Sequence, residues 1–253
     1  MGKILEIENV SAGYGEEIVL KDVNLVINDN DFIGIIGPNG GGKTTLLRLI
    51  IGLIRPYRGS VRFFDDSRER SGGSIGYLPQ ISHTDPRFPI SVIDVVLSGL
   101  MSKEGLFSRY PARLKRRAEE LLNRLGIEDL KKKNIGELSG GQLQRVYLCR
   151  AIISSPRLLM LDEPSTFVDT MFETDFYGIL KQLNRDMAII VVSHDVGTIS
   201  WYVKTIACVN RSLHYHPSNV ITQEQLAAYN CPIQIITHGD IPHTVLEMHK
   251  HPK

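Results

Sequence analysis

The hydrophobic pattern of the chain changes between the two-residue period of strands and the wider spacing of helices, which predicts an α/β protein. Polar and apolar residues alternate in Ile4–Val10 and Ile18–Ile27, which predict two antiparallel strands with a turn at Ser11–Gly15 between them. Asp31–Ile36 is mostly apolar and predicts a buried strand, and the spacing of Leu46–Ile54 predicts a helix after it.

A glycine-rich loop joins this strand to the helix. It has the spacing G-x-x-x-x-G-K-T, in the residues Gly37-Pro38-Asn39-Gly40-Gly41-Gly42-Lys43-Thr44-Thr45. Glycines let successive backbone N–H groups point into one concavity, and the helix N-terminus adds partial positive charge. Lys43 is expected to reach the β- and γ-phosphates, and the Thr44 hydroxyl is expected to bind Mg²⁺. The loop therefore predicts binding of a nucleoside triphosphate.

Two polar or aromatic positions near this loop have two interpretations each. Tyr14 stands on a glycine turn, where it either stacks on a nucleotide base or is a surface residue. Ile75–Gln80 predicts a short strand that ends at Pro79, and an amide at Gln80 can bind Mg²⁺ or orient a water. Without other evidence, a glutamine that merely begins a loop is the simpler interpretation of Gln80.

Between about residues 81 and 136 the alternation of strands and helices is interrupted. Val92–Leu100 and Pro111–Leu125 both have helical apolar spacing, and the second is rich in basic residues. We interpret those basic residues as a solvated helix face rather than a binding patch. The stretch therefore predicts a helical lobe inserted into the sheet domain.

A second loop suited to anions follows the lobe, with the residues Leu138-Ser139-Gly140-Gly141-Gln142 before a helical pattern at Leu143–Ile153. Serine and glycine at a helix start favour anion binding. One triphosphate can use both loops of one chain only if the lobe folds over it. The alternative is that each loop serves the nucleotide of a second, two-fold related copy.

Acidic residues end a later apolar strand, Leu158–Asp162. Asp162 suits Mg²⁺, and Glu163 is placed to polarise an attacking water. Asp169 follows in a short loop. Met187–Val192 predicts the final apolar strand, after which His194 can contact a γ-phosphate, although a structural histidine is the simpler interpretation of that residue alone.

Composition limits the class of protein only weakly. The chain has 253 residues, 42% of them hydrophobic and 23% charged, which is enough for a large core. A net charge of +1 gives no electrostatic argument for nucleic acid, and three cysteines suit a reducing cytoplasm. No apolar run reaches the roughly 18 residues of a membrane-spanning helix, so work at a membrane would need docking to another protein.

Together these motifs resemble the ATP-binding cassette (ABC) ATPases, because the two loops, Gln80, the acid pair, Asp169 and His194 stand in the family's order. The resemblance implies an ABC ATPase core of the P-loop NTPase fold, with an N-terminal antiparallel β subdomain and an α-helical lobe inserted at about 81–136. The ATPase domain would span residues 1–215, and residues 216–253 would form a histidine-containing tail. The implied activity is ATP hydrolysis with Mg²⁺.

The resemblance also implies roles for single residues. Each ATP would lie between the P-loop of one subunit and Ser139, Gly140 and Gly141 of the other in a head-to-tail homodimer. Tyr14 would stack on adenine, and Lys43, Glu163, Gln80 and His194 would act as phosphate ligand, general base, metal-site link and γ-phosphate switch. Thr44, Gln80 and Asp162 would hold Mg²⁺, and Asp169 would lie in the loop that crosses to the partner. Phe167-Val168 is bulkier than the residues that many members have before this aspartate.

A single cassette without a membrane span resembles an importer subunit at the cytoplasmic face of the inner membrane. Gly76–Gln80 and Phe88–Val96 resemble the zinc and manganese uptake cassettes, with siderophore, haem or cobalamin cassettes as the alternative. The implied partners are an integral membrane permease and, indirectly, a substrate-binding protein, without nucleic acid. An exporter, or a non-transport ABC protein that acts on DNA or ribosomes, is the competing interpretation.

Six of the eight histidines lie at or after position 214. They are His214, His216, His238, His243, His249 and His251. Neutral imidazole is a common zinc ligand, but these spacings match no zinc-site template. We favour a surface tail with chance histidines over a tail that senses cytosolic metal.

Overall fold

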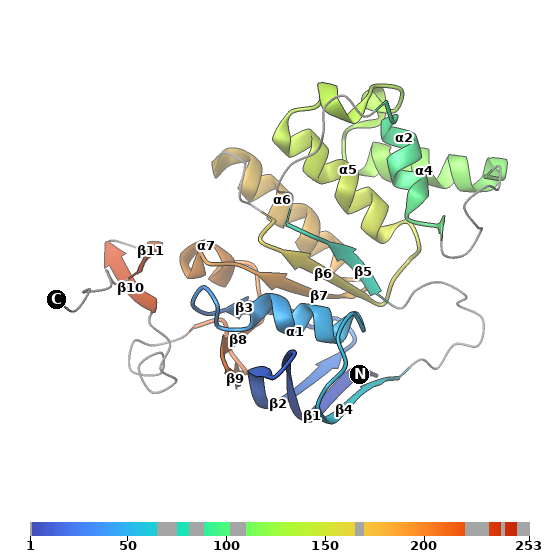
Figure 1. The fold of residues 1–253 in the computed structure, drawn as a ribbon. Helices are drawn as coiled ribbons and strands as arrows, with labels where there is room; N and C mark the ends of the chain where they lie inside the picture. The colour runs from blue at the N-terminus through green and yellow to red at the C-terminus, as the bar shows by residue number, and fades with distance from the viewer. Residues whose placement is uncertain are drawn as a thin grey trace. The chain divides into compact units, whose positions relative to one another are not determined.

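The computed structural model describes residues 2–64, 75–80, 89–101, 110–164, 170–220, 233–238 and 241–246. The chain forms two compact units, Met1–Phe64 with Ala188–Lys253 and, second, Asp65–Met187 (Figure 1). Among the described residues, no helix combines the length and apolar character needed to cross a bilayer.

The first unit begins with an antiparallel sheet in the order β2-β1-β4 (Figure 1). Its strands are β1 (Lys3–Tyr14), β2 (Glu17–Asn28) and β4 (Arg58–Phe63). Alternate residues of β2, such as Val23, Leu25 and Ile27, are buried while their neighbours are exposed. This alternation gives the sheet one core face and one solvent face, as the sequence pattern predicts.

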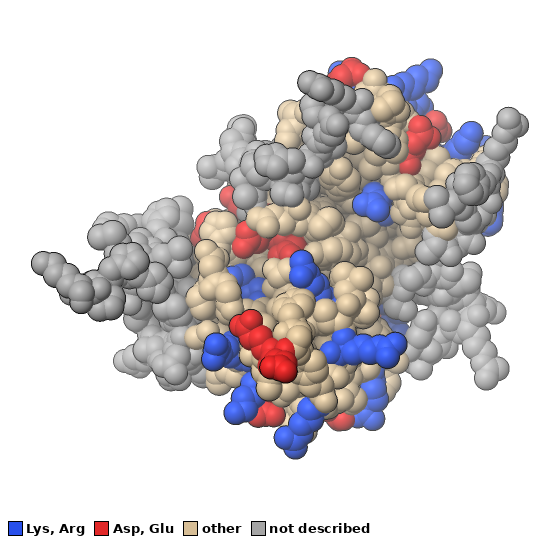
Figure 2. Space-filling model, in the orientation of Figure 1, with Lys and Arg blue, Asp and Glu red and all other residues tan. Residues whose placement is uncertain are grey.

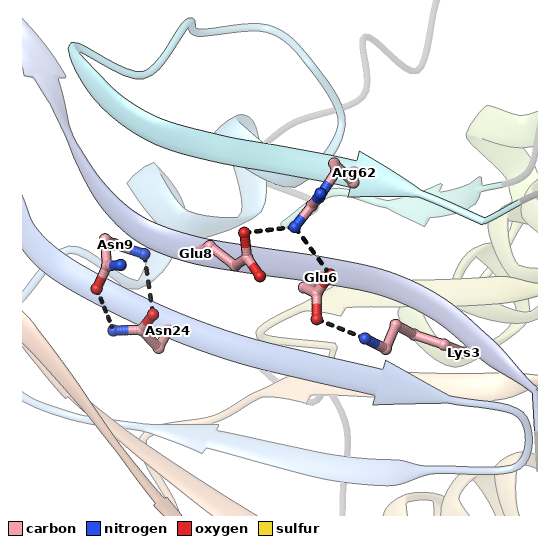
Figure 3. A network of polar contacts seen from close by, with 6 residues as sticks. All are labelled: Lys3, Glu6, Glu8, Asn9, Asn24 and Arg62. Atoms are coloured by element: carbon pink, nitrogen blue, oxygen red, sulfur yellow. Dashed lines mark hydrogen bonds and ion pairs between the residues drawn. The ribbon is translucent and has the colours of Figure 1, made fainter.

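Polar contacts cross the solvent face of this sheet (Figure 3). Arg62 on β4 makes an ion pair with Glu8 and a second one of 3.3 Å with Glu6, which also pairs with Lys3. Next to it, the backbone N–H of Asn9 donates to Asn24 Oδ1 at 2.9 Å. Arg62, Glu8 and Asn24 are exposed to solvent, so we assign their contacts the small stabilisation that is usual for surface pairs, while Glu6 is only 13% exposed.

The first unit also contains strands in the order β7-β3-β8-β9. β3 (Phe32–Ile36) pairs in parallel with β7 (Ala188–Val192) and β8 (Thr205–Asn210), while β9 (Ser212–His216) returns antiparallel to β8. All residues of β3 and β7 are buried, which explains their continuous apolar sequence. The helices are α1 (Lys43–Ile50) and α7 (Val196–Ser200), and a separate hairpin joins β10 (Ile233–His238) to β11 (Ile241–Leu246).

The second unit pairs β5 (Ile75–Leu78) in parallel with β6 (Leu158–Asp162). Its helices are α2 (Val92–Ser98), α4 (Ala112–Arg124), α5 (Gly140–Ile152) and α6 (Thr170–Leu183), with the short 3₁₀ turns η1 (Glu128–Leu130) and η2 (Ile135–Glu137). α5 packs against α2, α4 and β5 and is the central helix of this unit (Figure 1). Leu114, Ala118 and Leu122 are buried on one side of α4. The predicted solvated face is seen in its basic residues, which are exposed except for the half-buried Arg117.

Three expectations about the elements are wrong. The turn predicted at Ser11–Gly15 is strand as far as Tyr14, because irregular register between β1 and β2 lets the pairing continue to Glu17. The helix predicted to begin at Leu46 begins at Lys43, directly after the glycines. Met187–Val192 is not the final strand, since β8 to β11 follow it.

Two glycines let neighbouring elements approach the C-terminal part of α5 closely. One is in β5, and the other directly follows α2. A Cβ atom on Gly76 of β5 would lie 2.3 Å from the Ala151 carbonyl oxygen, and one on Gly99 would lie 2.1 Å from the Arg150 carbonyl oxygen. No side chain fits at these distances, so the two glycines let the backbone of α5 pack directly on its neighbours.

We predict that Gly76→Ala lowers the free energy of unfolding by about 1–3 kcal/mol, because backbone atoms must move to admit the methyl group. Denaturant titration measures this change. Gly178→Ala in α6 is the matched control, since nothing lies within 4 Å of its new methyl group. That variant should gain about 0.5–1 kcal/mol from helix propensity. Equal unfolding midpoints for the two variants would contradict the packing argument.

Candidate functional site

The first unit shapes the phosphate loop through glycine conformations. Gly37, Gly40 and Gly42 have φ angles of 150°, 75° and 104°, a region that favours glycine. A Cβ atom on Gly37 would lie 2.0 Å from the Val209 carbonyl oxygen on β8. The loop backbone therefore lies directly on β8, and side chains do not fill the space between them.

The turn between β8 and β9 supports the other side of the loop. The backbone N–H of Arg211 donates to the Gly41 carbonyl at 2.9 Å, and the Gly41 N–H donates to the Pro38 carbonyl at 3.0 Å. Gly42 is the N-cap residue of α1 and makes no side-chain capping bond. Asn39 and Gly40 are exposed at the tip of the loop.

Lys43 lies inside this loop, with only 7% of its surface exposed. Its ammonium donates to the carbonyl oxygens of Gly37 and Pro38 at 2.9 and 3.0 Å. Loop carbonyls therefore partly compensate the burial of a positive charge. The next two threonines differ, because Thr44 is exposed and Thr45 is buried. Of the two hydroxyls, the exposed Thr44 hydroxyl is the one accessible to a metal.

Tyr14 ends β1 and exposes 42% of its surface. Arg48 of α1 donates to its hydroxyl at 3.1 Å and places its guanidinium 5.9 Å from the ring centroid. These contacts hold an exposed aromatic ring beside the helix that begins at the phosphate loop. The geometry is compatible with stacking on a base.

His194 is exposed between β7 and α7, and its neighbours on both sides are fixed. Ser193 is buried and its hydroxyl accepts the Asp195 N–H at 3.0 Å. Asp195 caps α7 by accepting the Thr198 N–H at 3.1 Å. His194 thus lies in a hydrogen-bonded turn at the carboxyl end of the parallel strand β7, where ligand sites of α/β proteins lie.

In the second unit, β6 ends in the two acids. Asp162 is buried, and the Tyr77 hydroxyl donates to its Oδ2 at 3.4 Å. Glu163 has a φ of 46°, which is unusual for a residue other than glycine. In proteins generally, such strained backbone conformations cluster at active sites and ligand-binding sites. Gln80 donates from Nε2 to Glu163 Oε2 at 2.9 Å. The end of β5 therefore contacts both carboxylates.

The second glycine loop begins α5, also in the second unit. Ser139 is its N-cap residue, and its hydroxyl accepts the Gln142 N–H at 3.3 Å. The Gln142 side chain accepts the Ser139 N–H at 3.1 Å, which completes a capping box. Ser139 and Gly140 are exposed, Leu138 and Gln142 are half-buried, and Gly141 is buried. The helix tip is thus ordered and open to solvent.

A comparison with known families decides the class. The family model described as ABC transporter matches residues 20–166, from β2 through both glycine loops to the acids. The chain belongs to the ABC transporter family. It is accordingly a cassette with ABC ATPase activity, and the sequence-based expectation of that family is confirmed.

Characterised relatives cover nearly the whole cassette. The zinc uptake system ATP-binding protein ZurA of Listeria innocua is 38% identical over 232 residues, which is 90% of each chain. The manganese transport system ATP-binding protein MntB of Halalkalibacterium halodurans is 36% identical over 230 residues, 90% of this chain and 92% of that one.

Two solved structures are also similar to the cassette. An ABC transporter described as of the metal-chelate type, in an inward-facing conformation, has a TM-score of 0.82 and 27% identity and covers 98% of each chain. A dimeric bacterial ABC transporter cassette has a TM-score of 0.70 and 27% identity, covering 87% of this chain and all of that one.

Two polar contacts of this cassette were missed by sequence reasoning. Tyr77 contacts Asp162, and the buried Gln144 of α5 donates to the Pro164 carbonyl. Gln144 had a detectable signal, because it is a polar residue on the stripe that contains Gly141 and Leu148. Tyr77 had none, since an aromatic residue in a strand ordinarily indicates packing. Asp169, with Phe167 and Val168, lies outside the described residues.

The tail histidines are described only in part. On β9, the Ser212 hydroxyl lies 3.2 Å from His214 Nε2, and His216 is buried. Burial and the neighbouring His214 lower the pKa of His216, which favours its neutral form. Among the described residues, no three His, Cys, Asp or Glu side chains are grouped to hold a metal ion. His249 and His251 lie outside the described residues, as do the side chains of His238 and His243.

Proposed function

We propose that this cassette powers the uptake of a transition-metal ion, zinc or manganese, through a separate membrane permease. The similarity to zinc and manganese uptake proteins over about 90% of the chain carries this proposal. The cassette would bind peripherally at the cytoplasmic face of the membrane and would receive cargo indirectly from a substrate-binding protein. On the face shown in Figure 2, basic and acidic side chains are interspersed, which gives no support for a nucleic-acid partner.

A metal chelate, such as a siderophore, haem or cobalamin, is the second candidate cargo. The similarity to a transporter of the metal-chelate type favours it, because that structure covers 98% of the chain. Its identity of 27% is lower than the 38% of the zinc uptake protein. We therefore prefer the free metal ion.

The residue types that each unit contributes would suit Mg²⁺–ATP. Mg²⁺ prefers oxygen ligands, and Thr44 and Gln80 are exposed while Asp162 contributes a carboxylate at the end of β6. The Gln80 amide nitrogen already donates to Glu163, which leaves its carbonyl oxygen for a metal. The glycine loop and Lys43 suit the phosphates, and Mg²⁺ when bound would neutralise charge that develops on them.

For hydrolysis, Glu163 would accept the proton of the water that attacks the γ-phosphorus. Phosphoryl transfer needs positioning more than covalent help from the protein, so the orientation of this carboxylate matters. Gln80 supplies that orientation through its 2.9 Å hydrogen bond to Glu163. His194 would contact the γ-phosphate from the hydrogen-bonded turn after β7.

Each active site would be built from two copies of the chain. The exposed Ser139 and Gly140 at the tip of α5 would bind the ATP held by the partner's phosphate loop. The similarity to a dimeric bacterial cassette supports this arrangement. A homodimer would then contain two ATP molecules, with Asp169 in the loop that crosses to the partner.

We predict that Glu163→Gln lowers ATP turnover by about 10²–10⁴-fold, the usual contribution of a positioned base. ATP binding should persist, because the amide keeps the shape of the carboxylate and the phosphate loop is unchanged. Phosphate release measures turnover and calorimetry measures binding. Near-normal turnover would remove Glu163 from this role.

Ser139→Arg should prevent the ATP-dependent dimer and leave binding of ATP to the monomer intact. The larger, charged side chain would occupy the helix tip that faces the partner's nucleotide. Light scattering with ATP, performed on the Glu163→Gln background that retains ATP, measures the dimer. A Ser139→Arg protein that still dimerises would show that the two-copy site is wrong.

Deletion of this chain should lower the zinc or manganese content of cells grown with limiting metal. Elemental analysis of the cells measures the change, and restoration by the wild-type chain but not by Glu163→Gln would link it to ATP hydrolysis. A deletion strain that loses only uptake of a metal chelate would favour the second candidate. Unchanged uptake of all of these cargoes would contradict the proposal.

A further inference from the structure

Gln144 is an amide in α5, the helix that begins at Leu138-Ser139-Gly140-Gly141-Gln142, which is the signature loop of the family; we call α5 the signature helix. The buried positions around Gln144 are mostly apolar. Only 2% of its surface is exposed, and it lies on the helix stripe that also buries Gly141 and Leu148. Its Nε2 donates to the carbonyl oxygen of Pro164. A buried amide is tolerated when it is hydrogen-bonded, and the acceptor here is the residue that directly follows Glu163.

Pro164 is a stiff point for such a contact. The proline ring fixes φ, so a hydrogen bond to its carbonyl oxygen restricts the backbone next to Glu163. Glu163 itself has a φ of 46°, a conformation that surrounding contacts must maintain. Gln144 therefore restrains the residue that follows Glu163, while Gln80 contacts the Glu163 carboxylate.

The next residue of α5 makes a second tie. Arg145 donates from Nη1 to the Leu125 carbonyl at 2.8 Å and forms an ion pair through Nη2 with Asp175 of α6. Arg145 is mostly buried and Asp175 is exposed. Two consecutive side chains of α5 thus contact the chain on both sides of residues 165–169, the segment that contains Asp169.

α5 is one continuous helix whose C-terminal half is held by its neighbours. Its C-terminal half packs against β5 and α2 at Gly76 and Gly99, without room for side chains. Its N-terminal tip, with Ser139 and Gly140, is exposed. A force at the tip is therefore carried along a hydrogen-bonded helix to Gln144, one turn away.

We propose that Gln144, supported by the Arg145–Asp175 pair, is a positioning residue that sets the placement of Glu163 according to the position of the signature helix. The proposal rests on the two-copy site of the proposed function, in which Ser139 contacts the partner's ATP. Contact at the tip of α5 would then orient the base within the same chain. Hydrolysis in one copy would depend on whether its signature loop is engaged.

Gln144→Leu tests this link, because leucine has a similar size and leaves the Pro164 carbonyl without its amide donor. Asn184→Leu is the matched control. Asn184 is also a buried amide of the second unit, 5% exposed, and lies directly after the end of α6, where it donates to the Met187 carbonyl at 3.1 Å. Both variants lose an amide hydrogen bond to a backbone carbonyl.

We expect both variants to lower the thermal midpoint by a similar amount, about 2–8 °C. Gln144→Leu should also lower kcat by about 10-fold, because a misplaced base slows the chemical step. Its KM for ATP should change by less than about twofold, since the phosphate loop is untouched. Asn184→Leu should keep both constants within about twofold of the wild type.

A second variant avoids the core. Asp175→Asn removes the charge that pairs with Arg145 at an exposed position, and we expect kcat to fall by about two- to fivefold with KM unchanged. Equal kcat losses in Gln144→Leu and Asn184→Leu would overturn the positioning role and leave a purely structural one. Wild-type kcat in Gln144→Leu would overturn it as well.

The Glu163→Gln protein separates this inference from the proposed function. If the Glu163→Gln protein does not dimerise with ATP, the two-copy site is wrong, and the positioning proposal is wrong with it. If the Glu163→Gln protein dimerises while Gln144→Leu keeps wild-type kcat and KM, only the proposed positioning role of Gln144 is wrong. Dimerisation of the Glu163→Gln protein together with a selective kcat loss in Gln144→Leu supports both.

Discussion

The close approach of Gly37 to the Val209 carbonyl is the constraint on which the phosphate loop depends. Only a residue without a Cβ atom fits there, since a Cβ would lie 2.0 Å from that oxygen. The contact requires β8 to pair in parallel with β3, and the turn after β8 then donates the Arg211 N–H to Gly41. The loop carbonyls that result accept hydrogen bonds from the Lys43 ammonium. One backbone contact thus connects the sheet order to the charge at the site.

The polar groups of the second unit follow a different logic. Here side-chain hydrogen bonds, and not glycine conformations, orient the two carboxylates at the end of β6. Tyr77 and Gln80 come from one short segment and contact Asp162 and Glu163 respectively. The left-handed backbone at Glu163 shows that this orientation is achieved against local preference. Strain of this kind persists only where neighbouring contacts over-determine the conformation.

Most of the fold and much of the candidate site could be predicted from the sequence, because the decisive signals are local. The loop of residues 37–45 and the acid pair after an apolar strand can each be recognised from fewer than ten consecutive residues. The β8–β9 hairpin was not predicted, since Arg211 occupies its turn with a φ of 61°, where turn rules expect glycine or asparagine. The continuation of β1 to Tyr14 was missed because Ser11 and Gly13 resemble a turn, whereas pairing with β2 overrides that preference.

Hydrogen bonds between groups distant in sequence could not be predicted from local sequence patterns. Gln144 is separated from Pro164 by a helix, a turn and a strand, so only the fold reveals its acceptor. Its sequence nevertheless carries a warning, because an amide on an apolar helix stripe must find a partner or cost free energy. A polar residue on such a stripe therefore indicates that a hydrogen-bond partner lies close to it in the fold. In this cassette that partner is the carbonyl of Pro164, the residue that follows the proposed general base Glu163.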